Sequence, residues 1–152
     1  MPNHRPKLPA ARAGFTLIEI LVELAIAAVL VAIAVPSYGD YLRRARIVEA
    51  AARLADHHAR MEQFFLDHRR YDDGAGNCGQ APPRASAADA FGIACTASPN
   101  AYVVTATGVA GKGMAGFVYA IDEANFRRTN AVPDGWVANA QCWVIRRDGT
   151  CL

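Results

Sequence analysis

Hydrophobic residues form one long, nearly uninterrupted block close to the start of this chain. From Phe15 to Val35 every residue is apolar except Thr16, Glu19 and Glu23. As an α-helix these 21 residues would be about 32 Å long, which matches the roughly 30 Å hydrocarbon core of a bilayer. A buried helix of a soluble protein rarely stays apolar on every face over this length. The pattern therefore predicts a membrane-spanning helix.

After Pro36 the pattern changes to a single apolar stripe. The stripe recurs at alternating spacings of four and three residues, at Ile47, Ala51, Leu54, His58, Met61 and Phe65. This spacing is typical of an amphipathic helix. Proline lacks an amide donor, so we expect Pro36 to kink or loosen the helix rather than end it. One long helix is predicted from about Phe15 to about His68.

The rest of the chain has loop and strand composition. Residues 71–100 are rich in Gly, Pro, Asn, Ala and Asp, which predicts a loop with a short helical turn at 87–91. Four segments then read as strands joined by hairpin-length connections: 101–109, 116–122, 125–132 and 142–149. One face of this antiparallel sheet would cover the apolar stripe of the helix. The expected fold class is α+β.

Four cysteines, Cys78, Cys95, Cys142 and Cys151, show no CxxC pair and no zinc-type histidine spacing. An even number beyond a membrane helix indicates two disulfides and an oxidising compartment. Three connectivities exist. We expect Cys78–Cys95 and Cys142–Cys151, because each pair would staple one loop.

Charge is unevenly placed around the apolar block. Residues 1–14 carry three basic residues and no acid, which favours a cytoplasmic N-terminus. The whole chain has a formal charge of +2, but without residues 1–14 it retains 13 basic and 14 acidic residues. The composition therefore gives no general indication of nucleic-acid binding.

The two glutamates in the apolar block are costly in a membrane and usually mark function there. The context of Glu19, "GFTLIE" followed by about sixteen apolar residues and "PSYGDY", resembles the N-terminus of type IV prepilins of the IVa class. The order of loop, four strands and C-terminal cysteine loop agrees with that family's fold. Two further stretches, "RMEQFFLDHRRYDD" and "CWVIRRDGTC", look most like the PilE-type minor pilins.

The resemblance implies a specific processing and assembly route. A prepilin peptidase would cut between Gly14 and Phe15 and methylate the new amine of Phe15. Glu19 would then neutralise the Phe15 amine of a neighbouring subunit in the filament, where a paired carboxylate costs far less than a lone one. Before assembly, Glu19 could instead pair with its own amine or be protonated. Glu23 lies on the same helical face; it could bind a second partner or sit protonated without a role.

The resemblance also divides the chain and names its surroundings. The expected parts are a leader (1–14), a membrane and filament-core half of the helix (15–36), its amphipathic half (37–70) and a globular head (71–152). The partners would be other major and minor pilins, the prepilin peptidase and the inner membrane. The head would lie in the periplasm before assembly and on the extracellular pilus afterwards.

Few other residues suggest chemistry. Adjacent histidines on one helix chelate poorly, so Asp56-His57-His58 does not predict a metal site, and no cofactor or catalytic motif is found. If Arg128 and Arg147 faced outward, Lys112 could join them in a small DNA-binding patch, and an exposed tryptophan beside arginines would strengthen that hypothesis.

These observations predict a structural minor pilin that primes or contributes to pilus assembly, with roles in twitching motility, adhesion or surface attachment. Two alternatives remain: a minor pilin acting as a DNA-uptake receptor, and a pseudopilin of type II secretion.

Overall fold

The computed structural model describes residues 14–152, apart from the side chains of residues 36 and 37. The leader lies outside the described residues except for Gly14. The chain divides into two compact units, residues 1–38 and residues 39–152, which we call the N-terminal unit and the head.

Helix α1, Leu17–His68, passes through both units. It continues through Pro36, as expected from a proline that does not end the helix. It ends where Arg69 takes a left-handed backbone conformation, with φ 58°. The Arg69 amide still donates to the Phe65 carbonyl at 2.8 Å, so the last turn is closed before the chain leaves the helix axis.

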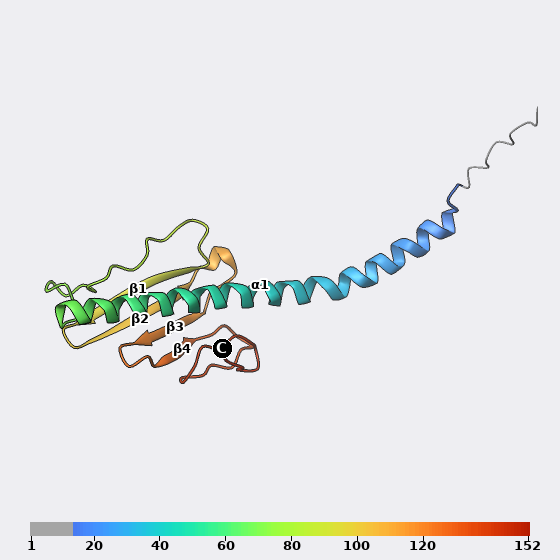
Figure 1. Cartoon of the computed structure of the whole chain (residues 1–152). Coiled ribbons are helices and arrows are strands. Elements are labelled where there is room, and N and C mark those ends of the chain that lie inside the picture. The colour runs from blue at the N-terminus through green and yellow to red at the C-terminus, as the bar shows by residue number, and fades with distance from the viewer. Residues whose placement is uncertain (1–13) are drawn as a thin grey trace, which may run out of the picture. The chain divides into compact units, whose positions relative to one another are not determined.

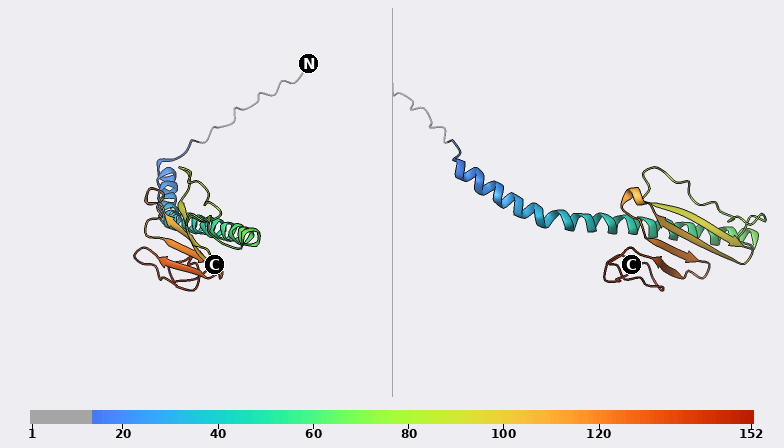
Figure 2. Two further views of the ribbon diagram at one scale, coloured as in Figure 1. Left: turned by 90° about the vertical axis from the view of Figure 1, so that its left-hand side faces the viewer. Right: turned by 180° about the vertical axis from the view of Figure 1, so that it is seen from behind.

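Four strands form one antiparallel sheet in the order β1-β2-β3-β4. They are β1 (Phe91–Ser98), β2 (Ala101–Gly108), β3 (Val118–Asp122) and β4 (Arg127–Ala131), with the short 3-10 helix η1 (Ala110–Lys112) between β2 and β3. Figure 1 and the reverse view in Figure 2 show the C-terminal half of α1 lying across one face of this sheet. The expected α+β type IV pilin fold is confirmed.

The strand assignment needs two corrections. Residues 91–98, expected as loop after a helical turn, form β1 and pair with β2 from Phe91↔Gly108 to Ser98↔Ala101. Residues 142–149, expected as the last strand, form no strand and contribute only the isolated bridge Val144↔Cys151. The number of strands was right, but the sheet begins one strand earlier in the chain than predicted.

The core forms between the helix stripe and one face of the sheet. The predicted stripe is buried at Ile47, Ala51, Leu54 and Met61, with His58 and Phe65 partly buried. From the sheet, alternate residues of β2 and β3 point into the same core: Tyr102, Val104, Ala106, Tyr119 and Ile121. Trp143 completes it from the C-terminal segment and is 2% exposed.

Two disulfides tie the irregular segments to this core. Cys78–Cys95 links the long loop after α1 to β1, and Cys142–Cys151 closes the C-terminal loop, which is the pairing expected from the sequence. In the head, the loop after α1 is also held by an ion pair between Arg53 and Asp89 at 2.6 Å.

Candidate functional site

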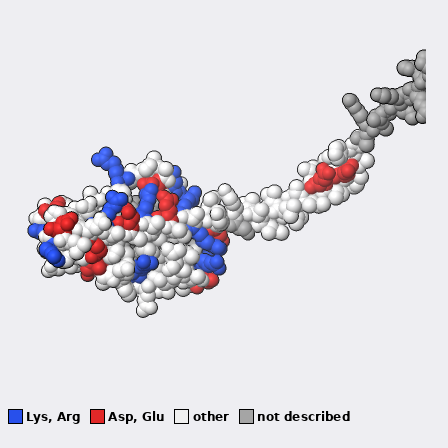
Figure 3. All heavy atoms as spheres, in the orientation of Figure 1, with Lys and Arg blue, Asp and Glu red and all other residues white. Residues whose placement is uncertain are grey.

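The N-terminal unit carries the residues expected to act in processing and assembly. Apart from Glu19 and Glu23, helix α1 is apolar here, and its large side chains are exposed in the single chain, Leu17 at 78% and Leu24 at 62%. In the part of the chain that the structure describes, α1 is the one helix long and apolar enough to cross a membrane. Figure 3 shows red acidic atoms in only one place along the white described part of this segment.

Glu19 takes part in the N-terminal cap of α1. The Thr16 amide donates to Glu19 Oε2 at 3.4 Å, and the Glu19 amide donates to Thr16 Oγ1 at 3.3 Å. This reciprocal pair is a capping box, which the Thr-x-x-Glu signature at Thr16 and Glu19 predicts but which the apolar pattern alone does not reveal. In the single chain, the Glu19 carboxylate thus already has a partner in its own backbone.

The head carries a second candidate site, a groove of about 270 Å³ at the end where α1 enters it. We call it the base groove. It is lined by Arg43, Gly113, Ala115, Phe117, Pro133, Asp134, Trp136 and Arg147. These residues come from α1, the η1–β3 connection and the segment after β4, so three parts of the chain that are distant in sequence meet here. Figure 3 shows blue basic atoms gathered at this end of the head.

Two arginines and two aspartates set the charge of the base groove, and two more basic residues lie next to it. Arg43 and Arg147 both bind Asp40 Oδ1, at 2.9 Å and 3.2 Å, so a single carboxylate serves two guanidinium groups. Arg46 donates to the backbone carbonyl of Lys112 at 2.5 Å. A carbonyl carries no charge, so this contact neutralises neither the Arg46 guanidinium nor the Lys112 ammonium group. The side chain of Arg147 is 56% exposed, so its remaining donors face solvent.

Trp136 supplies an aromatic surface to the same groove. Its ring is partly buried and packs edge-on against Phe117, with centroids 4.8 Å apart. The wall behind it is tight: Gly116 has φ 84°, and a Cβ there would lie 3.2 Å from Pro133. A residue with a side chain would be strained at Gly116. The groove therefore presents a fixed aromatic ring beside two arginines.

The three residues expected to form a basic patch do not all meet. Arg147 lines the base groove, and Lys112 directly precedes Gly113, which also lines it; Arg43 and Arg46 of α1 lie beside them. Arg128 does not line the groove. It donates to Asp122 Oδ2 at 2.8 Å, and its guanidinium lies 5.5 Å from the Phe126 ring. Arg128 is therefore occupied within the sheet.

The two adjacent histidines on α1 lie within or beside the core of the head. His58 Nδ1 lies 2.5 Å from the Tyr102 hydroxyl, and burial together with the nearby Glu62 raises the pKa of Tyr102. His57 is 1% exposed, and burial lowers its pKa. Among residues 14–152, no cluster of three or more metal-ligating side chains occurs.

The base groove has the chemistry of a polyanion site. Guanidinium and ammonium groups bind phosphates, and an aromatic face can stack on a base. The N-terminal unit has the chemistry of a packing element, because its apolar surface is not covered by its own chain. The two sites lie in different units and would serve different partners.

Comparisons with known families match both parts of the chain. A model described as the prokaryotic N-terminal methylation motif matches residues 9–35. A model described as "Type IV minor pilin ComP, DNA uptake sequence receptor" matches residues 36–115, just over half of the chain. The second match includes Arg43, Arg46 and Lys112 of the base region but ends before Arg147.

Curated relatives are major pilins and a prepilin-related protein. The type IV major pilin PilE1 of Neisseria gonorrhoeae is 34% identical over 70 residues, which cover 46% of this chain and 42% of that protein. The major pilin PilA of Myxococcus xanthus is 38% identical over 71 residues, 47% of this chain and 32% of that protein. Prepilin peptidase-dependent protein D of Escherichia coli is 38% identical over 66 residues, 42% and 45% of the two chains. The matched part thus spans less than half the length of each relative.

Proposed function

Because this chain belongs to the type IV minor pilin family described as ComP, DNA uptake sequence receptor, we propose that its head binds duplex DNA at the base groove. As a member of a pilin family it is a structural, non-enzymatic protein. The membership agrees with the expected minor pilin and not with the pseudopilin alternative. Of the functions considered from sequence, the family description favours the DNA-uptake receptor over a purely structural subunit.

The observation that carries this proposal is the meeting of Arg43, Arg147 and the Trp136 ring in one groove, with Arg46 and Lys112 next to it. Arg43 and Arg46 come from α1, Lys112 from η1 and Arg147 from the C-terminal loop, while Asp40 and Asp134 are the acids at the groove. Two net positive charges at one end of an otherwise nearly neutral chain make a local phosphate-binding surface. Trp136 would add contact with a sugar or base edge.

Asp40 gives the proposed site a mode of exchange. Its carboxylate accepts hydrogen bonds from both Arg43 and Arg147. A DNA phosphate would take the place of this carboxylate. Binding would replace one carboxylate contact by charge-assisted contacts to the phosphate backbone. The two arginines could therefore exchange the Asp40 carboxylate for DNA phosphates, each of which can accept several hydrogen bonds.

The route to the cell surface follows from the methylation motif. The precursor would insert in the inner membrane with its head in the periplasm, and prepilin peptidase would cut between Gly14 and Phe15 and methylate Phe15. Other pilins would then take the subunit into a pilus, with Glu19 facing a neighbour's Phe15 amine and Glu23 available as a second contact. At the pilus surface, the base groove would meet extracellular DNA.

Salt-dependent binding tests the DNA proposal directly. The head, residues 39–152, contains its own core and disulfides, and we expect it to bind duplex DNA with a slope of log affinity against log salt of about −3.6, for four phosphate contacts. Arg147→Ala should weaken binding on all sequences and reduce the slope by about 1. Arg84→Ala is the matched control, because Arg84 is exposed in the loop after α1 and is not a residue of the groove.

Asp40→Asn tests the exchange. Removing one competing carboxylate should raise DNA affinity about five-fold, a gain of about 1 kcal/mol. Competition with a shuffled duplex would measure sequence preference in the same experiment. If the head fails to bind any duplex at low salt, or if Arg147→Ala and Arg84→Ala behave alike, the base groove is not a DNA site.

A second candidate is a structural role in assembly, supported by the uncovered apolar surface of the N-terminal unit. Here the subunit would prime or stabilise pili, and its loss would reduce surface piliation, twitching and attachment. Deleting the gene separates the two functions: DNA uptake should be lost while pili persist if the receptor role dominates. Loss of pili together with uptake would favour the structural role.

A further inference from the structure

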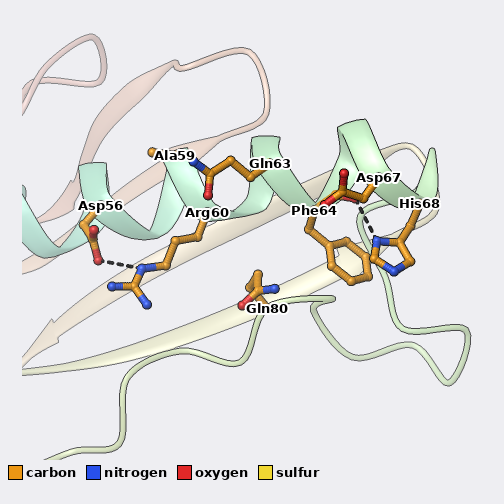
Figure 4. Close-up of a pocket in the computed structure, with 8 residues that line it drawn as sticks. All are labelled: Asp56, Ala59, Arg60, Gln63, Phe64, Asp67, His68 and Gln80. Carbon is orange, nitrogen blue, oxygen red and sulfur yellow. Dashed lines mark hydrogen bonds and ion pairs between the residues drawn. The ribbon is translucent and has the colours of Figure 1, made fainter.

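A polar cavity lies beside the last turns of α1, away from the base groove. It has a volume of about 500 Å³, within the range of small-molecule sites. One wall is the helix face from Asp56 to His68, and the facing wall is Gln80 in the loop after α1. In Figure 4, the Gln80 side chain rises from this loop toward the helix, and the Arg60 guanidinium extends toward the loop. We propose that this cavity binds one neutral saccharide unit.

The facing wall is held in place by covalent and backbone contacts. The Cys78–Cys95 disulfide ties the loop to β1, and the Gly79 amide donates to the Tyr71 carbonyl at 2.7 Å. Gly79 also lies against Phe64 so closely that a Cβ at Gly79 would be 2.0 Å from the ring. Gln80 follows directly, so its position relative to the helix is fixed.

The lining offers donors and acceptors in the mixture that a sugar ring requires. Arg60 Nε donates to Asp56 Oδ2 at 3.0 Å, which orients the guanidinium and leaves its other N–H groups for a ligand. Gln63 and Gln80 each bring an amide that can both donate and accept, and Asp67 brings acceptors. Adjacent hydroxyl groups of a saccharide also donate and accept, so they can bind both kinds of group.

An aromatic surface borders these polar groups. The rings of Phe64 and His68 stack with centroids 4.1 Å apart and an angle of 13° between their planes. His68 Nδ1 lies 3.1 Å from the Phe64 carbonyl, which fixes the orientation of the imidazole. A fixed stack of this kind gives the apolar C–H face of a sugar ring a surface to rest on.

Charge separates this cavity from the proposed DNA site. Asp56 and Asp67 outnumber Arg60, so the lining disfavours phosphate and other anions. From Arg43 to Phe64 the distance along the helix axis is about 30 Å. The saccharide proposal is therefore independent of DNA binding, and each can fail without the other.

Saturation-transfer NMR on the full chain tests the proposal, in dodecylphosphocholine micelles because sugar-based detergents would compete. The probes are D-glucose, D-galactose and N-acetyl-D-glucosamine, with inorganic phosphate as a competitor. We expect transfer to at least one sugar, unaffected by phosphate, and about ten-fold weaker binding in Gln80→Ala. Gln141→Ala is the matched control, an exposed glutamine of the C-terminal loop outside the cavity.

Two results would overturn the saccharide site. One is no transfer to any of the three sugars from a chain whose unchanged melting shows that it is folded. The other is sugar binding that Gln80→Ala leaves unchanged, or that phosphate displaces. Since Gln80 makes no contact in the core, Gln80→Ala should melt like the wild-type chain, and a loss of binding then reports on the cavity.

Discussion

The two halves of α1 share one backbone conformation but differ in what covers their apolar side chains. In the head, Leu54 is completely buried, and the stripe to which it belongs packs on the chain's own sheet. In the N-terminal unit, Leu24 is 62% exposed, and its large apolar neighbours all around the helix are exposed too. Burial of the stripe in the head stabilises the fold of a single chain, whereas the exposed apolar side chains of the N-terminal unit do not.

The difference shows where the partners of this protein must act. Each large apolar side chain left in water forgoes roughly 1.5–3 kcal/mol of burial. The N-terminal unit can recover this only from lipid or from other helices, whereas the head needs neither. In an apolar setting a carboxylate such as Glu19 is costly unless it is paired, so we expect the N-terminal half of α1 to depend more on partners than the half in the head.

Glu19→Val should give the largest effect, and only in the assembled state. We expect the variant to be cleaved normally but to be almost absent from pili, because the neighbour's Phe15 amine would be left without its counter-ion. Immunoblots of sheared pili and of membranes measure this. Glu23→Val is the matched comparison and should be incorporated more nearly as the wild type is. Normal incorporation of Glu19→Val would refute the pairing role.

Leu54→Ala and Leu24→Ala compare the two halves by the same chemical change. Leu54→Ala should lower the free energy of unfolding of the head by about 2–5 kcal/mol, because it opens a cavity in the core. Leu24→Ala should leave it unchanged. Denaturant unfolding of the full chain in detergent, followed by tryptophan fluorescence, measures both. Equal losses would mean that the head is not a self-sufficient unit.

Cys142→Ser should have a smaller effect, confined to the head. The bond closes a short loop with a sequence separation of 9, so its loss should cost about 2.5 kcal/mol of stability through the entropy of the unfolded chain. The N-terminal half should keep its helical circular dichroism. A melting temperature equal to that of the wild type would contradict this contribution.

The smallest effect should come from a partly buried ion pair of the head. Hydrogen bonds from Arg53 and then from the Ser86 amide lower the pKa of Asp89 to about 2. Since the pKa in the folded state is the lower one, this stabilisation is present above the ordinary pKa of 3.8 and is lost as the pH falls toward about 2. Asp89→Asn should therefore melt slightly lower than the wild type at pH 7, and the gap should close in acid. A gap that stays constant with pH would exclude the charge as its cause.

The helix and both disulfides could be predicted from the sequence because their signals are local. The 3.6-residue stripe and the even cysteine count do not depend on distant contacts. The sheet was harder to predict. Residues 91–98 contain Gly92, Ala94 and Ala97, which have low strand propensity, yet pairing with β2 overrides that preference. Residues 142–149 alternate like a strand, but their bonds go to Thr129 and to the disulfide loop instead.

The candidate site could be predicted only in part, because it too depends on contacts between residues that are distant in the sequence. Lys112 and Arg147 were expected together; Arg147 lines the base groove, and Lys112 directly precedes Gly113, which also lines it. Arg128 was expected with them, but Asp122 on the neighbouring strand binds it. Arg43 and Arg46 were not part of the predicted patch, because the contacts that bring Arg147 to Asp40 and Arg46 to Lys112 form only in the folded chain.

Thr129 has a consequence for how the protein must mature. It lies on β4, an edge strand: its amide donates to the Asn139 carbonyl at 3.0 Å, its hydroxyl donates to the Cys142 carbonyl at 2.6 Å, and the Val144 amide donates to that hydroxyl at 2.9 Å. The C-terminal segment thus shields backbone groups that would otherwise recruit a strand from another molecule. Until oxidation closes that segment, newly exported heads would be open to edge-to-edge aggregation. We therefore expect formation of Cys142–Cys151 to protect solubility as well as stability.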